Sequence, residues 1–494
     1  MKSLFLLTVI LCIAFAADAQ NVGIGTTNPD ASAKLDVTST DKGMLVPRMT
    51  EAQRNAISAP ATGLLIYQTD NTPGFYYYNG SAWGPVSKSG AGNTAGYGTW
   101  GDCSSNNISE YYPVTDATGS ADDDFGYSVS ISGNCAIVGA PYDDVGTNVD
   151  QGSASIYQWD GTGWVMMQKL TDATGSASDY FGTSVSISGN YAIVGARYDD
   201  VGSNINQGSA SIYHWDGGNW VLMQKLTDAT GSAYDYFGNS VSISGNYAIV
   251  GATYAEVSTN NEQGSVSIYQ WDGANWVLMQ KLTDATGSAF DYFGTSVSIS
   301  GNYAIIGASG DDVGTNIEQG SASIYHWDGT NWVLMQKLTD AYGGTDEHFG
   351  GSVSISGNYA IVGAYNDVVG TNTDQGSASI YHWDGTNWVM MQKLTDATGS
   401  AQDNFGVGVS ISGNYAIVGA VGDDVGANSF QGSATVYQRV GLGWKKLQYV
   451  TDPGGNAGDR FGYSIGVDGA IKRFVVGALG YGQFSGSAIF GKIN

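Results

Sequence analysis

Residues 181–196, FGTSVSISGNYAIVGA, decide the fold because they carry a two-strand pattern that recurs along the chain. Phe181, Val185 and Ile187 fall on one face of the first half, as in a strand that buries one side. Gly189 and Asn190 supply a tight turn before the second half. The Phe-Gly dipeptide that opens the stretch returns every 56 residues, with its phenylalanine at Phe125, Phe181, Phe237, Phe293, Phe349, Phe405 and Phe461.

Two more strands follow in each repeat. In the repeat that opens at Phe181, the first two strands are predicted at 181–188 and 191–196, and the next two at 208–215 and 220–226. The last two flank another tight turn of the Asp-Gly type. Four antiparallel strands per unit, at one fixed period, are typical of a β-propeller.

The two ends of the repeat array complement each other. The seventh repeat has no fourth strand, and its three predicted strands are 461–467, 474–478 and 486–490. Residues 108–116 match the missing strand and precede the first Phe-Gly, so we expect them to complete the last blade and close the ring. Pro113 suits that outermost position, since one edge of the strand is unpaired. The prediction is an all-β fold with a seven-bladed β-propeller over residues 108–494.

The N-terminal part divides into three predicted segments. Residues 1–19 combine Lys2, a short apolar run and a small-x-small cleavage site, which indicates a secretory signal peptide and a secreted or cell-surface protein. No segment is long and apolar enough to predict a transmembrane helix. Residues 20–87 predict a small β-rich module with one short helix near 50–58, and residues 88–107 predict a Ser-, Gly- and Asn-rich linker.

Composition excludes several classes of protein. The 494 residues include 72 Gly and only 13% charged residues, a bias that favours short strands and turns over helices. The formal charge of −26 would repel nucleic acid, so we expect no nucleic-acid binding. Three cysteines do not make a disulfide scaffold; Cys103 and Cys135 either pair in an oxidising compartment or stay free.

The repeat resembles a known family. Phe125-Gly126 with Val138-Gly139-Ala140-Pro141 is similar to the FG-GAP repeat of integrin α-subunit heads and many bacterial surface proteins. Every repeat keeps both Phe-Gly and Gly-Ala, and the resemblance covers about residues 108–494. It implies a propeller, but a shared fold does not by itself fix a function.

The N-terminal module has a resemblance of its own. Its opening at 21–29, NVGIGTTNP, is similar to modules at the front of exported proteins of Bacteroidota and of phage tail-fibre-like proteins. The resemblance covers roughly residues 21–85. It implies an attachment or assembly piece, and with it a homotrimer formed through this module.

Strand alternation places the two long loops of every repeat on one side of the ring, and these loops hold most of the acidic residues. Clustered carboxylates suit Ca²⁺ or a basic partner, and Asp and Asn equally cap turns and solvate loops. The candidate metal ligands are Asp143, Asp144, Asp199, Asp200, Asp311, Asp312, Asp423 and Asp424. Two features count against Ca²⁺: the calcium loop of integrin repeats is missing between Phe-Gly and Gly-Ala, and the third repeat has Ala255-Glu256 in place of Asp-Asp.

No catalytic constellation stands out, so we expect no enzyme. The Trp-Asp-Gly-x-x-Trp element, as at Trp215 and Trp220, suggests either packing between blades or stacking on carbohydrate. His214 shares its repeat position with glutamines, and His348 is a single loop histidine. The sequence contains no zinc-protease helix, phosphate loop or nucleophile elbow.

These observations predict an exported, non-enzymatic binding or adhesion protein. It would recognise a protein or glycan at the cell surface through the acidic loop side of the propeller. Two alternatives stay open, namely a glycan-binding or glycan-active propeller and a structural, fibre-like component.

Overall fold

The computed structural model describes residues 22–24, 35–37, 46–71, 74–78, 82–85, 111–116, 119–120, 122–480 and 486–493. The chain forms two compact units, Met1–Asp102 and Cys103–Asn494, which are described separately. The predicted signal peptide (1–19), the predicted linker (88–107) and Cys103 lie outside the described residues. Cys135 has no disulfide partner among the described residues. Since Cys103 lies outside them, both predicted alternatives, a Cys103–Cys135 disulfide and two free thiols, stay open.

The N-terminal unit contains a two-stranded parallel pair and a four-stranded sheet. Its elements are β1 (Val22–Ile24), β2 (Leu35–Val37), β3 (Arg48–Met49), α1 (Glu51–Asn55), β4 (Leu65–Gln68), β5 (Gly74–Tyr78) and β6 (Trp83–Pro85). β1 pairs with β2, and the sheet has the order β3-β4-β5-β6. The predicted short helix is confirmed, because Thr50 and Gln53 form a reciprocal capping box at the start of α1.

The C-terminal unit consists of four-stranded antiparallel sheets, which we number as blades in chain order. Blade 1 is β8 (Ser128–Ser132), β9 (Cys135–Ala140), β10 (Ser153–Trp159) and β11 (Trp164–Leu170); blade 2 is β12 (Phe181–Ser188), β13 (Tyr191–Ala196), β14 (Ser209–Trp215) and β15 (Trp220–Leu226). Blade 3 is β16 (Phe237–Ser244), β17 (Tyr247–Ala252), β18 (Ser265–Trp271) and β19 (Trp276–Leu282); blade 4 is β20 (Phe293–Ser300), β21 (Tyr303–Ala308), β22 (Ser321–Trp327) and β23 (Trp332–Leu338). Blade 5 is β24 (Ser352–Ser356), β25 (Tyr359–Ala364), β26 (Ser377–Trp383) and β27 (Trp388–Leu394); blade 6 is β28 (Phe405–Ser412), β29 (Tyr415–Ala420), β30 (Ser433–Val440) and β31 (Gly443–Val450). Blade 7 is β32 (Ile465–Asp468), β33 (Arg473–Ala478), β34 (Ser487–Lys492) and β7 (Tyr111–Val114).

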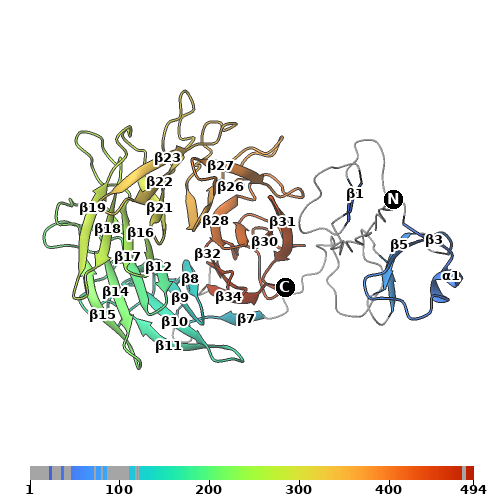
Figure 1. The fold of residues 1–494 in the computed structure, drawn as a ribbon. Coiled ribbons are helices and arrows are strands. Elements are labelled where there is room, and N and C mark those ends of the chain that lie inside the picture. Colours follow the sequence, from blue (N-terminus) through green and yellow to red (C-terminus); the bar gives the residue numbers. More distant parts are fainter. Residues whose placement is uncertain are drawn as a thin grey trace, which may run out of the picture. The chain divides into compact units, whose positions relative to one another are not determined.

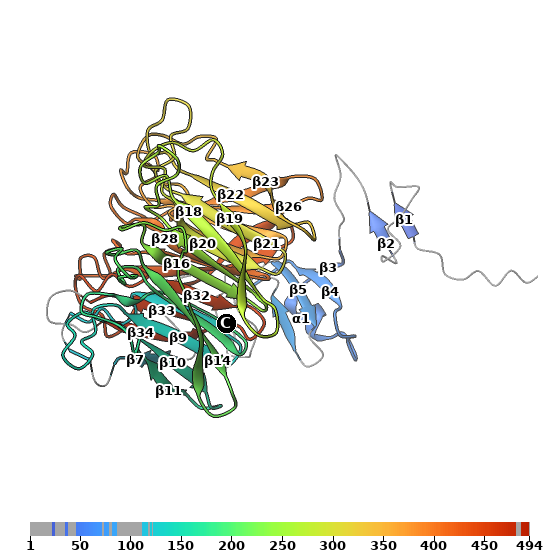
Figure 2. The same ribbon diagram turned by 90° about the vertical axis from the view of Figure 1, so that its left-hand side faces the viewer.

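This arrangement is the predicted β-propeller. The first strand of each sheet, such as β8, β12 or β32, lies nearest a common centre, and fourth strands such as β11, β15 and β19 lie at the rim (Figure 1). Turned by 90°, the strands of neighbouring blades lie face to face (Figure 2).

The N-terminal strand β7 belongs to the last sheet. It pairs antiparallel with β34, from Ala488 opposite Val114 to Gly491 opposite Tyr111. Blade 7 then meets blade 1 through a bond that is repeated between other blades: Ser464 Oγ donates to the Gly126 carbonyl at 2.7 Å, as Ser184 Oγ donates to the Gly238 carbonyl at 2.7 Å. The same type of contact therefore joins the last blade to the first.

The apolar core lies between blades. One cluster combines Ile212 and Leu226 of blade 2 with Phe237, Val250 and Trp276 of blade 3. The second tryptophan of each Trp-Asp-Gly-x-x-Trp element is buried, with Trp220 only 3% exposed. The interpretation of this element as packing between blades is confirmed, and these buried rings are closed to carbohydrate.

Close approach of neighbouring backbones explains the glycines in the Phe-Gly and Gly-Ala motifs of the repeat. Gly182 has φ +99°, and a Cβ there would lie 2.2 Å from the Ser153 carbonyl oxygen. A Cβ on Gly195, in the Gly-Ala pair, would lie 2.0 Å from the Gly238 carbonyl oxygen of the next blade. No side chain fits at either place, so glycine is required there for steric reasons.

Candidate functional site: the long-loop face

The loops after the second and fourth strands emerge on the same side of the propeller, which we call the long-loop face. In blade 2 they are residues 197–208 and 227–236. In blades 1 to 6, backbone hydrogen bonds join the loop after the second strand to the loop after the fourth strand, for example Tyr234 N to Ile205 O at 2.9 Å. Each of these six blades therefore presents one combined loop pair.

In several blades, the first aspartate of the predicted metal-binding pair forms an ion pair with a lysine. Lys225 Nζ lies 2.5 Å from Asp199 and 2.7 Å from Asp172, which follows the fourth strand of the preceding blade. We call this arrangement the lysine bridge. It recurs for Lys169 with Asp143 and for Lys337 with Asp311. In blade 6, Asp423 accepts hydrogen bonds instead from Tyr449 and Ser433, both at 2.6 Å.

The second aspartate of each pair faces a different environment. It is exposed and accepts one backbone hydrogen bond from its own loop, as Asp200 does from Asn206 N at 2.8 Å. Asp144, Asp312 and Asp424 do the same at 2.9 Å. The two carboxylates of a pair thus have separate partners, and Ca²⁺ binding by these eight residues stays a prediction.

Burial perturbs the acids that cap the loops. Ser176 N donates to Asp179 at 2.6 Å, yet burial outweighs that bond and raises the pKa of Asp179 to about 6. Burial likewise raises the pKa of Asp123, Asp291 and Asp403 to about 6 and that of Glu347 to about 7. At Asp172, burial acts in the same direction, but the hydrogen bonds from Lys225 and Thr174 outweigh it and lower the pKa.

These opposite shifts predict how stability depends on pH. A carboxyl whose folded pKa is raised stabilises the protein below its unfolded pKa near 4 and loses that contribution as pH rises through 6 to 7. We therefore expect the melting temperature to rise when pH falls from 8 to 5. Below about pH 4 it should fall, because Asp172 and its equivalents become protonated and lose their lysine.

Circular dichroism melts between pH 3 and 8 measure this profile. Glu347→Gln is the control, since it should flatten the change between pH 6 and 7 and leave the acid limb intact. A melting temperature that decreases steadily from pH 8 to 5 would contradict the prediction.

A row of tyrosine rings crosses the long-loop face near the propeller axis. Consecutive ring centroids are 4.8 Å apart along Tyr142, Tyr180, Tyr198, Tyr236 and Tyr254, and Tyr292 follows at 5.3 Å. We call these six residues the tyrosine arc. The positions lie just before Phe-Gly or just after Gly-Ala, so each ring stands at the inner end of a loop.

The arc breaks the symmetry of the repeat. The positions that continue it beyond Tyr292 hold Gly310, His348, Asn366 and Asn404. Tyr292 covers Gly310, where a Cβ would lie 2.8 Å from the Tyr292 ring. The continuous row of stacked tyrosines therefore ends at Tyr292.

One cation already lies on the arc. The guanidinium of Arg197 is 4.9 Å from the centroid of Tyr198 and 5.7 Å from that of Tyr180. Burial raises the pKa of Tyr236 and Tyr254 above the usual 10, so both rings keep their hydroxyl proton at neutral pH. Electron-rich neutral rings of this kind attract cations.

A cavity of about 490 Å³ opens at the blade 3 end of the arc. It is lined by Tyr234, Tyr236, Tyr254, Glu256, Glu262 and, beside them, Asp235. Tyr234 is 53% exposed and Tyr254 is 37% exposed, which is unusual for large rings. None of the described residues that line this cavity is basic.

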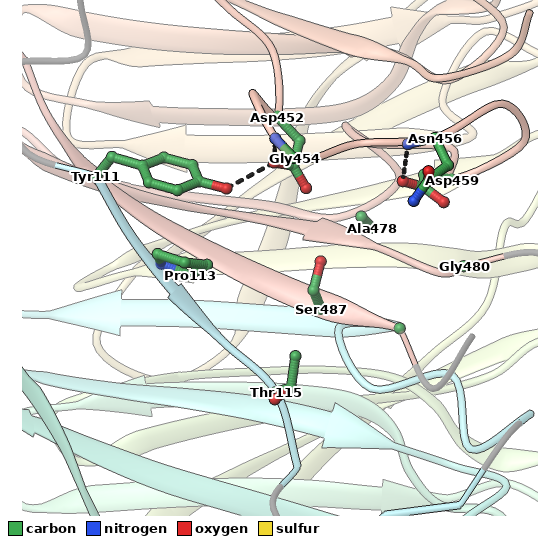
Figure 3. Close-up of a pocket in the computed structure, with 11 residues that line it drawn as sticks. Tyr111, Pro113, Thr115, Asp452, Gly454, Asn456, Asp459, Ala478, Gly480 and Ser487 are labelled. Atoms are coloured by element: carbon green, nitrogen blue, oxygen red, sulfur yellow. Dashed lines mark hydrogen bonds between the residues drawn. The ribbon is translucent and has the colours of Figure 1, made fainter. Parts of the chain in front are cut away.

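A second cavity of about 350 Å³ lies in blade 7, beside the closing strand (Figure 3). Pro113 occupies the position at which other blades carry the bridging lysine. Instead, the Tyr111 hydroxyl donates to Asp452 at 2.6 Å, and Asn456 N donates to Asp459 at 2.5 Å. Tyr111 therefore takes the place of the bridging lysine in blade 7.

The family comparison agrees with the geometry of the blades. The family described as FG-GAP repeat matches residues 113–157, 164–213, 220–269, 276–325, 332–381 and 388–437. The chain belongs to the FG-GAP repeat family. Each match begins in the fourth strand of one blade and ends in the third strand of the next, so the first FG-GAP repeat begins in the closing strand β7.

A second family covers the N-terminal unit. The phage tail like trimerisation region matches residues 23–99. This agrees with the resemblance to phage tail-fibre-like modules and points to oligomerisation. No curated protein matches the chain.

Sequence reasoning missed the two features that shape this FG-GAP face. The sequence assigns only Arg197 and Arg460 as basic residues to the loop side, because the bridging lysines belong to fourth strands and reach the loops only in three dimensions. The tyrosine arc could have been predicted in part from the sequence, since a tyrosine directly precedes Phe-Gly at Tyr180, Tyr236 and Tyr292. The described part of the chain contains no helix with the length and hydropathy to cross a membrane.

Proposed function

We propose that this FG-GAP propeller is a binding domain that recognises a basic protein segment at the blade 3 end of the tyrosine arc. The observation that carries the proposal is the cavity that combines the rings of Tyr234, Tyr236 and Tyr254 with the carboxylates of Glu256 and Glu262. Aromatic faces beside carboxylates suit a lysine or arginine side chain better than an anionic or neutral group. FG-GAP propellers are typically non-enzymatic, and adhesion or binding is a common role for them.

Charge complementarity supports this ligand class. The chain carries a formal charge of −26, which accelerates the approach of a cationic partner. The arc already accommodates the guanidinium of Arg197 on Tyr198. The second tryptophans of the Trp-Asp-Gly-x-x-Trp elements are not available to a ligand, because Trp220 and its equivalents are buried.

A lysine nonapeptide tests the proposal, with a glutamate nonapeptide as the control probe. We expect the lysine peptide to bind the full chain in isothermal titration, and we expect its affinity to decrease as the salt concentration increases. Tyr236→Ala should reduce the affinity about tenfold or more, since a desolvated cation on an aromatic ring contributes about 1–2 kcal/mol.

Glu262→Gln should also weaken binding, and Asp374→Asn is its matched control. Asp374 occupies the equivalent position in a blade without arc tyrosines, so it removes the same charge elsewhere on the face. Equal losses from both variants, or equal binding of the two peptides, would contradict the proposal. Binding of neutral oligosaccharides but not of the lysine peptide would favour the glycan alternative.

We further propose that the protein is exported by the signal peptide predicted at 1–19 and assembles as a homotrimer through its N-terminal unit. The match of residues 23–99 to a trimerisation region supports this assembly. A trimer would present three binding faces and raise avidity for a multivalent surface. Light scattering that gives the mass of a single chain would contradict the trimer.

A further inference from the structure

Glu318, Asp346 and His348 meet on the long-loop face where blade 4 leads into blade 5. One ligand atom from each of them lies within 4.8 Å of the other two. Within the described residues, this is the only group of three His, Cys, Asp or Glu side chains with that geometry. The cluster is distinct from the tyrosine-lined cavity and contains none of its lining residues.

The backbone holds the two loops of this cluster together. Asp346 N donates to Ile317 O at 2.9 Å, and His348 N donates to Glu318 O at 3.3 Å. The equivalent bonds occur one repeat earlier, from Phe290 N and Tyr292 N. The scaffold is therefore common to the blades, and only the side chains at this place are special.

The His348 ring is fixed in orientation and tautomer. Its Nδ1 lies 3.1 Å from the Ser309 carbonyl oxygen, and since a carbonyl only accepts, Nδ1 must carry the hydrogen. The ring also stacks on Tyr365, with centroids 5.3 Å apart and planes at 21°. A backbone carbonyl on one ring nitrogen is the usual support for a histidine that binds a metal through the other.

The other nitrogen then faces a carboxylate. His348 Nε2 lies 3.0 Å from Asp346 Oδ1. In the neutral ring Nε2 offers a lone pair, and a lone pair does not attract a carboxylate oxygen. A metal ion bound by both atoms would satisfy the nitrogen lone pair and the carboxylate together.

We propose that Glu318, Asp346 and His348 bind a first-row transition-metal ion, with Zn²⁺ as the best fit. Two carboxylates balance the charge of a divalent ion, and the imidazole nitrogen selects zinc over Ca²⁺. The side chains of Glu318 and Asp346 are exposed, so small rotations can bring their oxygens to the coordination distance of about 2.0–2.2 Å. The fourth coordination position would take water or a donor atom from a partner.

Zinc titration of the EDTA-treated full chain tests the site. We expect isothermal titration to give one tight site per chain that excess Ca²⁺ does not displace. His348→Asn and Glu318→Gln should each weaken zinc at least about tenfold, the scale found even for outer-shell partners of metal ligands. Asn is the residue at the equivalent position 404, so the loop accommodates it. Asp374→Asn, the equivalent acid of the next blade, should bind zinc like the unmodified chain.

Nitrogen chemical shifts of the four histidines identify the ligand atom. Zinc should shift one Nε2 signal, and that signal should be absent from the His348→Asn spectrum. Unchanged zinc affinity in His348→Asn would overturn the site, as would a protonated His348 that shows no response to zinc. If His348→Asn does not fold, the exposed Glu318→Gln variant decides the outcome by its affinity.

Discussion

Gly182→Ala is expected to cause the largest loss of stability. The left-handed φ of +99° costs an alanine about 1–3 kcal/mol, and its Cβ would also lie 2.2 Å from the Ser153 carbonyl oxygen of the preceding blade. The backbones of two blades would have to separate, which opens the apolar core between them. We expect a loss of about 4 kcal/mol or more in the free energy of unfolding, a large part of the total for most proteins.

The chain provides a matched control in Gly161→Ala. Gly161 has φ +102°, nearly the same backbone conformation, but no atom lies within 4 Å of the position of its Cβ. This variant should lose only the conformational part, about 1–2 kcal/mol. Urea unfolding followed by tryptophan fluorescence compares the two. Equal urea midpoints for the two variants would mean that the close approach of the blades at Gly182 does not add to the loss of stability.

Lys225→Met is expected to have the second largest effect. It leaves Asp172 and Asp199, which are almost fully buried, without their common cation. Removing one partner of a buried ion pair costs about 3–5 kcal/mol. Because 25% of the Lys225 side chain is exposed, we expect a smaller loss of about 2–3 kcal/mol.

Blade 3 provides the comparison for the lysine bridge. There Ala255 replaces one aspartate, and Lys281 forms an ion pair with a single carboxylate, that of Asp228, at 2.6 Å. Lys281→Met should therefore cost about 1 kcal/mol, as expected for a partly exposed single pair. Adding Asp199→Ala to Lys225→Met should restore part of the lost stability, since it removes one of the two uncompensated charges. Thermal melts at pH 7 test the order, and equal losses at Lys225 and Lys281 would contradict it.

The fold could be predicted from the sequence because its determinants are local and repeated. Phe181, Val185 and Ile187 show the strand period directly, and the glycines of Phe-Gly and Gly-Ala mark the backbone contacts between blades. The placement of β7 beside β34 followed from counting strands in units of the repeat.

The candidate site was harder to predict because its contacts join different loops and blades. Lys225 has the pattern of a strand residue in the sequence, and only the fold brings it to Asp172 of the preceding blade. Tyr198 and Tyr236 are far apart in the repeat, yet their rings are 4.8 Å apart. His348 gave no signal as a single loop histidine, since Glu318 and the Ser309 carbonyl reach it only in three dimensions.

The loop pairs of different blades share one backbone arrangement but carry different side chains. An equivalent 2.9 Å hydrogen bond to a backbone carbonyl is donated by the backbone N–H of Ser178, Tyr234, Phe290, Asp346, Gln402 and Gly458. The side chains of these residues have almost nothing in common. Since this arrangement depends on main-chain atoms, mutation can exchange the displayed side chains without rebuilding the ring. Such a face can acquire a new target in the way that an antibody paratope diversifies, through substitutions at a few positions per unit.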